Sequence, residues 1–217
     1  RLYLPGIFSM GTELTPYSTV DREFFERELD SFLPDRIYDA HCHIWREDCV
    51  EWAVPGGPPD VGLEDYRELI DQIHTGRPTR ALFIPFTTSR DADLRMKANE
   101  WIGEHVAGDR QCRGLFFITP QDDPEWVREN VRRLGLHGLK CYHTMSDVDP
   151  TWEAAIEDYL PEPLIKVADE EGWVITLHLV KSRAVADPAN IECIRHYCQP
   201  YPGMTLILAH SARGFQP

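Results

Sequence analysis

The segment Tyr38-Asp39-Ala40-His41-Cys42-His43-Ile44-Trp45 decides how this chain is interpreted. It continues a short apolar run that follows Pro34, which predicts a β-strand. Because successive side chains of a strand point to opposite faces, His41 and His43 are expected to share one face. Two imidazoles placed in this way can bind one metal ion, and Asp39, which has the same parity, can orient one of them. Taken alone, such a pair is more often two polar residues at the end of an ordinary strand.

Composition limits the classes of partner. The chain has 217 residues, of which 42% are hydrophobic and 27% charged, as in a globular protein of one large domain. Its net charge of -14 argues against nucleic acids and anionic membrane surfaces as partners, but not against a small anionic substrate. The sequence contains no run of 18 apolar residues, so no membrane span is predicted. Its six cysteines form no CxxC motif, which is typical of reduced cysteines in a cytoplasmic protein.

Strand and helix patterns alternate after an N-terminal extension, residues 1–34, in which one helix is predicted over 21–32. The main domain is expected over residues 35–217. Its predicted strands end at or near residues 43, 87, 119, 143, 178 and 210, and helices are predicted over 63–74, 92–106, 124–134, 152–171 and 188–198. The fourth of these helices is expected to be broken into two pieces by Pro161 and Pro163. The strands are almost entirely apolar, as in a parallel sheet covered on both faces. An open doubly wound sheet and a closed barrel both fit this alternation.

Histidines gather at the ends of the predicted strands. His41 and His43 end the first strand, and His143, His178 and His210 end the last three. In barrel enzymes the chemistry lies at the carboxyl ends of the strands. This placement therefore predicts a metal or acid–base site there. The remaining histidines are interpreted as surface or boundary residues: His74, His105, His137 and His196.

Three segments resemble the amidohydrolase superfamily: Asp39 to His43, Trp173 to His178, and Leu208-Ala209-His210-Ser211-Ala212-Arg213-Gly214. The most similar branch is the "amidohydrolase 2" group of metal-dependent hydrolases and decarboxylases, relatives of aminocarboxymuconate-semialdehyde decarboxylase. The resemblance runs from about Pro34 to the end of the sequence. It implies an α/β fold, a (β/α)8 TIM barrel of which this sequence holds the first six strands.

The resemblance also implies roles for the histidines. His41, His43 and His178 would be ligands of one divalent metal ion, for which we expect zinc. His210 would be the catalytic acid or base. It follows Leu206 on the same strand face, so we expect it to project from the barrel rim beside the metal ligands.

Lys140 lies within a strand that is expected to be covered on both faces, so its ammonium needs a partner. We rank a structural ion pair first, a substrate carboxylate second and a carboxylated lysine third. The third form bridges two metals in some relatives that share the Gly138-Leu-Lys140 pattern. Periodicity leaves open whether Lys140 or the opposite-parity pair of Cys141 and His143 faces the barrel interior.

The other substrate-binding candidates are His143, Trp45 and Arg213. Arg213 follows the last histidine closely and can bind a carboxylate through two hydrogen bonds, although a surface ion pair is equally compatible with its position. Arg90, soon after the second predicted strand, is a weaker candidate of the same kind.

These expectations combine into a functional hypothesis. The chain is predicted to be a metal-dependent hydrolase that acts on a small, carboxylate-bearing substrate through a metal-activated water. A non-oxidative decarboxylase on the same barrel is the alternative, and a non-catalytic ligand-binding barrel or a flavodoxin-like domain would be other classes. The expected partner is a small molecule, and a homo-oligomeric state stays open. The family's last two strands and the Asp that follows them are not in this sequence, so we expect it to be part of a longer chain.

Overall fold

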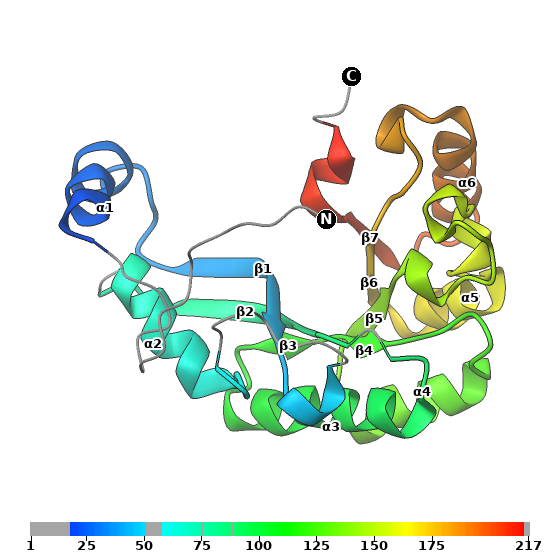
Figure 1. Cartoon of the computed structure of the whole chain (residues 1–217), viewed down its shortest axis with the longest axis horizontal. Helices are drawn as coiled ribbons and strands as arrows, with labels where there is room; N and C mark the ends of the chain where they lie inside the picture. The colour runs from blue at the N-terminus through cyan, green and yellow to red at the C-terminus, as the bar shows by residue number, and fades with distance from the viewer. Residues whose placement is uncertain (1–17, 51–57, 75, 88, 215–217) are drawn as a thin grey trace.

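The computed structural model describes residues 18–50, 58–74, 76–87 and 89–214, in which strands and helices alternate along the chain (Figure 1). The strands are β1 (Ile37–Ile44), β2 (Thr79–Pro85), β3 (Arg113–Gly114), β4 (Phe116–Phe117), β5 (Gly138–Cys141), β6 (Val174–Leu177) and β7 (Thr205–Leu208). The α-helices are α1 (Thr19–Phe24), α2 (Leu63–Ile73), α3 (Ala92–Gly108), α4 (Pro124–Arg133), α5 (Glu162–Glu171) and α6 (Pro188–Cys198). A π-helical turn, η1 (Phe25–Leu29), and 3-10 turns complete the order: η2 (Glu47–Cys49), η3 (His143–Met145), η4 (Thr151–Glu153), η5 (Ile156–Asp158), η6 (Ala184–Ala186) and η7 (Ala209–Arg213).

All six predicted strands are present, and the third is divided into β3 and β4. The strands pair in parallel in the orders β1-β2-β3 and β4-β5-β6-β7. The two groups join at Leu115, whose N–H donates to the carbonyl of Phe83 on β2 at 2.9 Å. One residue later, Phe116 lies opposite Leu139 of β5. The chain therefore builds one continuous arc of parallel strands.

The arc is the wall of a partial TIM barrel. Helices α2 to α6 lie along its outer side, α1 stands beyond the start of β1, and β1 and β7 stand at the two ends of the arc across an open space (Figure 1). Each of these two strands pairs with only one neighbour among the described strands, so the barrel is not closed. None of the described helices has the length and apolar character needed to cross a bilayer.

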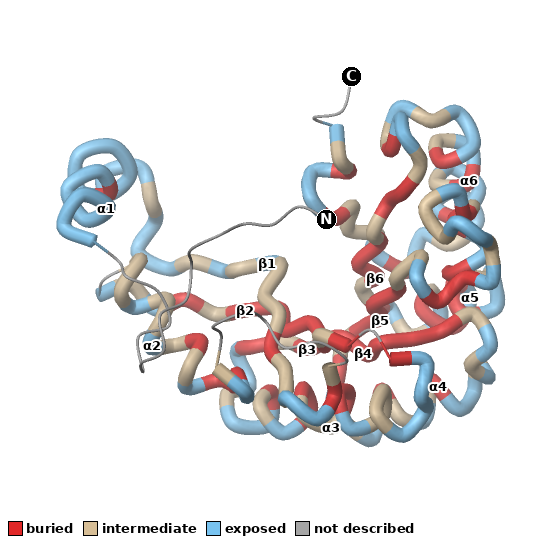
Figure 2. The backbone as a smooth tube through the Cα atoms, viewed as in Figure 1, coloured by how far each residue is buried: buried red, intermediate tan, exposed pale blue. Residues whose placement is uncertain are grey.

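The main core lies between the sheet and the helices. The middle strands of the arc and the helix sides that face them are buried, whereas β1 is only partly covered (Figure 2). The strand residues on this outer side are fully buried: Phe83, Phe116, Leu139, Cys141, Ile175 and Leu177. Each such side chain stabilises the fold by about 1.5–3 kcal/mol. A smaller apolar cluster of Leu82, Ile84 and Leu115 lies on the other face of the same strands.

The predicted helices needed two corrections. The first helix begins at Thr19, and its N-cap is Ser18, whose backbone N–H donates to the Asp21 carboxylate at 2.9 Å. Asp21, where the helix was predicted to begin, lies within the first turn and completes this capping box. In the region 152–171 the break at Pro161 and Pro163 is present as predicted, but the piece before it forms the 3-10 turns η4 and η5 and not an α-helix. The boundary of the N-terminal extension stays a prediction, since residues 1–17 lie outside the described part.

Candidate active site

A β-bulge in β1 places the histidine pair. Asp39 lies opposite Ala81 and Cys42 lies opposite Phe83, so β1 uses one residue more than β2 between these positions. After the bulge, Cys42 packs against the core under the helices, which leaves His41 and His43 on the concave side of the arc.

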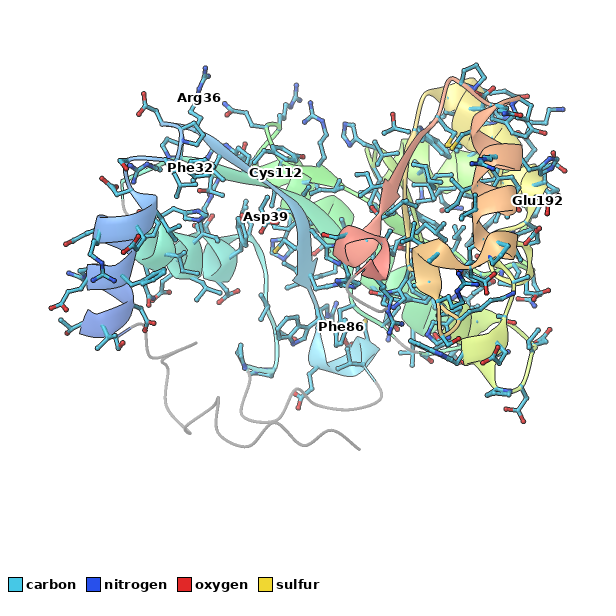
Figure 3. All side chains as sticks on the ribbon, turned by 90° about the horizontal axis from the view of Figure 1, so that it is seen from above. Phe32, Arg36, Asp39, Phe86, Cys112 and Glu192 are labelled. Atoms are coloured by element: carbon cyan, nitrogen blue, oxygen red, sulfur yellow. The ribbon has the colours of Figure 1, made fainter. Side chains whose placement is uncertain are left out.

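Because of the bulge, Asp39 does not orient a histidine ring as expected. Its carboxylate accepts the backbone N–H of His41 at 2.9 Å and does not hold an imidazole ring. Asp39 pairs with Ala81, which belongs to the core under the helices, so its carboxylate lies on the helix side. Figure 3 shows Asp39 on β1, with Arg36 ahead of the strand and Phe86 near its far end.

The rings of His41 and His43 converge. Their Nε2 atoms are 3.2 Å apart. Two nitrogen ligands of a tetrahedral zinc ion, each bound at about 2.0–2.1 Å, would be about 3.3 Å apart. Burial lowers the pKa of His41 to about 4 and that of His43 to about 3, with neighbouring charges adding to the effect. Both rings are therefore neutral near pH 7, as metal ligands must be, and the donor pair fits a divalent ion.

His210 joins this pair to His178. Its ring centroid lies 4.9 Å from that of His41 and 5.0 Å from that of His178. Leu206 packs on the helix-side core, so simple alternation would not have placed His210 in the site. The chain leaves β7 in a left-handed turn with φ of 55° at His210, a conformation that is costly for a residue other than glycine. This turn brings the imidazole over the concave side, where strained residues commonly serve function.

The predicted ligand set is only partly assembled. His178 contacts His210 rather than the His41–His43 pair, and its Nδ1 is buried without a hydrogen-bond partner. Within the described ranges, no group of three or more His, Cys, Asp or Glu side chains is arranged to hold a metal ion. The role of His178 as third ligand stays a prediction, because the ring of His210 lies between it and the pair.

The inner face of β5 carries Lys140 and Tyr142, which answers the question of parity that periodicity left open. Lys140 has no exposed surface, and its Nζ lies 4.2 Å from the centroid of the Tyr142 ring. No hydrogen bond to this ammonium and no ion pair to a described residue is present, so the structural ion pair that we ranked first was wrong. Burial lowers its pKa to about 8.

Sequence reasoning missed two members of the site. The hydroxyl of Tyr142 lies 3.4 Å from Nε2 of His43, and its ring centroid lies 5.7 Å from that of His178. Phe86, which follows β2, packs edge-on against His43 at 5.4 Å. The signal for Tyr142 was its spacing of two residues from Lys140, but it could be used only once the face was known.

His143 and Arg213 lie at the rim beside His178. The His143 ring is 5.9 Å from His178, and its Nδ1 lies 3.1 Å from the carbonyl oxygen of Thr151. Trp152 packs edge-on against His143 at 5.8 Å and carries the Arg213 guanidinium 4.1 Å above its ring. Arg213 is therefore held by an aromatic face next to the histidines.

Trp45 and Arg90 organise loops. The Trp45 indole donates to the carbonyl of Pro58 at 3.3 Å, and its backbone pairs with Val61. Arg90 forms an ion pair with Asp147 at 3.0 Å and donates to the carbonyl of Thr144. Arg90 thus ties the loop after β2 to the loop after β5. A role of Trp45 in substrate binding stays a prediction.

Comparison with known proteins identifies the family. Residues 38–217 match the sequence profile of the family described as amidohydrolase. The chain belongs to the amidohydrolase family. Among proteins with curated descriptions, none matches this sequence. The resemblance inferred from the histidine motifs is thereby confirmed, and divalent metals are the usual cofactors of this family.

Among solved structures, this amidohydrolase is similar to a probable 2-pyrone-4,6-dicarboxylic acid hydrolase from Acinetobacter baumannii, crystallised with citric acid bound. The identity is 11% and the TM-score 0.48, over 76% of this chain and 54% of that one. The present chain thus spans about half the length of that protein.

Proposed function

We propose that this chain carries the metal- and substrate-binding part of a metal-dependent hydrolase that acts on a small carboxylate-bearing molecule. The observation that carries the proposal is the separation of 3.2 Å between the Nε2 atoms of His41 and His43, two neutral imidazoles on the concave side of a barrel wall. Membership of the amidohydrolase family supports it.

The candidate residues would have distinct roles in the proposed hydrolysis. His41 and His43 would hold the ion, with His178 as the expected third ligand. A divalent ion bound there polarises a substrate oxygen and lowers the pKa of a water molecule. His210 lies at the surface of the concave side. Its pKa is lowered, first by partial desolvation of the ring and then by the charge of Lys140, so the imidazole is neutral near pH 7. It can therefore accept a proton from the attacking water. It would then return that proton to the leaving group.

Non-oxidative decarboxylation is the second candidate. The observation in its favour is the buried ammonium of Lys140 among the histidines, which suits a substrate carboxylate. In that reaction the carbon–carbon bond to the carboxylate breaks, carbon dioxide leaves, and the electron pair of the broken bond stays on the substrate carbon, which takes up a proton. His210 would take this proton from solvent and pass it to the carbon.

A substrate screen with and without metal tests the proposal. The purified chain should be stripped with a chelator, its metal content measured, and its activity followed on lactones, amides, and aromatic or enoic carboxylic acids. We expect turnover that disappears on stripping and returns with added zinc. Release of carbon dioxide rather than uptake of water would select the second candidate. Unchanged turnover in protein shown to be free of metal would contradict both.

A further inference from the structure

Lys140 is an uncompensated buried cation. Its side chain has no exposed surface, and its ammonium makes no hydrogen bond to any described residue. An ammonium carries three N–H donors, and a charge left in the interior without a partner destabilises the fold. Stacking on Tyr142 offsets only part of this cost. A group outside the described residues is therefore expected to complete the environment of Lys140.

The ammonium faces the histidine cluster. Its Nζ lies 4.2 Å from the centroid of the Tyr142 ring. That ring lies 5.7 Å from the ring of His178, and its hydroxyl lies 3.4 Å from Nε2 of His43. Arg213 contributes a second positive charge that acts on His178 and His210. The concave side is thus locally positive in a chain whose net charge is -14.

Tyr142 adds a neutral donor at the same place. A phenol has an ordinary pKa of about 10, so the Tyr142 hydroxyl keeps its proton near pH 7. The Tyr142 hydroxyl lies 3.4 Å from Nε2 of His43, one of the two candidate metal ligands. One strand face therefore presents an ammonium and a phenolic O–H beside the candidate metal ligands.

We propose that Lys140 and Tyr142 form a subsite that binds the carboxylate of the substrate, with the ammonium as the ionic partner and the phenol as a second donor. This subsite would make carboxylates the substrate class of the hydrolase proposed above. It rests on that function only because it takes the bound anion to be the substrate. Charge-assisted hydrogen bonds of this kind are about twice as strong as neutral ones.

A carboxylated lysine fits these surroundings less well. The face of an aromatic ring is electron-rich and attracts a cation. A carbamate on Nζ would bring negative charge against the Tyr142 face, 4.2 Å from the present nitrogen position. The unmodified ammonium is the form that the ring stabilises.

Benzoate and benzamide provide a test, because they share one shape and differ in charge. We expect calorimetry to show that the purified chain binds benzoate at least tenfold more tightly than benzamide. Lys140→Met should weaken benzoate binding tenfold or more and leave benzamide binding unchanged. Tyr142→Phe should weaken benzoate binding a few-fold. The matched control is Lys166→Met, because Lys166 is exposed on α5 and should not alter binding.

The same titration in the His41→Asn/His43→Asn double variant separates this subsite from the metal. Benzoate binding that survives in the double variant and is lost in Lys140→Met supports the subsite whether or not the metal assignment holds. Binding lost in the double variant but kept in Lys140→Met assigns the carboxylate to the ion and overturns the proposal.

Three further results would overturn it. They are equal affinity for benzoate and benzamide, no binding of benzoate at all, and a carbamate carbon signal in the 13C NMR spectrum after equilibration with 13C-bicarbonate. If Lys140→Met shows no cooperative melting transition, Tyr142→Phe decides, and an unchanged benzoate affinity in that variant overturns the two-residue subsite.

Discussion

The two faces of β5 differ in almost every physical respect. On the outer face, Leu139 and Cys141 are fully buried in the apolar core under the helices. On the inner face, Lys140 is equally buried but has no hydrogen-bond partner among the described residues, and Tyr142 lies beside His43. The outer residues stabilise the sheet, whereas the inner residues cost stability unless something binds to them.

The neighbouring strand repeats the contrast. On β6, Ile175 and Leu177 join the helix-side core, while Thr176 and His178 face inwards. Among the described residues, the Thr176 hydroxyl and Nδ1 of His178 are both buried without a hydrogen-bond partner. On β5 and β6 the polar groups that the described fold leaves unsatisfied therefore lie on the concave face beside the histidine cluster, and this face of the two strands is where a ligand is to be sought.

The largest expected effect concerns the inner face. If His210 transfers a proton and is not a ligand, His210→Asn should lower kcat by about 10²- to 10⁴-fold while the metal content stays near one ion per chain. His178→Asn should lose metal and activity together. Metal analysis, melting temperature and turnover on both variants check this.

The control for these variants is His196→Asn, because His196 lies exposed on α6 near Glu162. It should keep both metal and rate. An unchanged rate in His210→Asn would exclude the catalytic role of this residue. Loss of metal in that variant would make His210 a ligand.

The outer face should respond in stability rather than chemistry. Leu139→Ala removes a side chain with no exposed surface and should lower the free energy of unfolding by about 2–5 kcal/mol. Leu29→Ala, at a position that is 40% exposed, should change it by less than about 0.5 kcal/mol. Denaturant titration measures both. Comparable losses at the two positions would refute the assignment of the main core to the helix side.

The inner face should show a dependence on pH. Burial lowers the pKa of Lys140 from 10.5 to about 8, so between these values the unfolded chain holds a proton that the folded chain has released. The free energy of unfolding should then rise with pH across this window, by up to about 3 kcal/mol. Lys140→Met lacks this rise and should be more stable than the wild type at pH 7, with the difference vanishing near pH 10.5. Parallel pH profiles of the two proteins would contradict a buried, unpaired ammonium.

Much of the fold was predictable from the sequence. The apolar runs located all six strands, because strands buried on both faces contain few polar residues. Their parallel order placed His41, His43 and His178 at one rim, since the carboxyl ends of parallel strands share one edge. The division of the third strand at Leu115 left no mark in the hydrophobic pattern.

The details of the site were less predictable, because local backbone geometry decides them. Alternation assigned Asp39 to the face of His41, but a bulge inserts one residue between Asp39 and Cys42 and reverses its direction. The position of His210 depends on a left-handed turn formed by residues other than glycine, so the sequence carries no signal for this turn. Tyr142 was missed because the sequence of a strand that is buried on both faces does not show which of its side chains point into the barrel.

The metal content of the histidine-pair variant tests the central claim most directly. Elemental analysis of the purified protein should give one divalent transition metal ion per chain. The His41→Asn/His43→Asn double variant should contain almost none, while a His74→Asn/His105→Asn control, changed on α2 and α3 away from the concave side, should match the wild type. Full metal occupancy in the His41→Asn/His43→Asn protein would contradict the account.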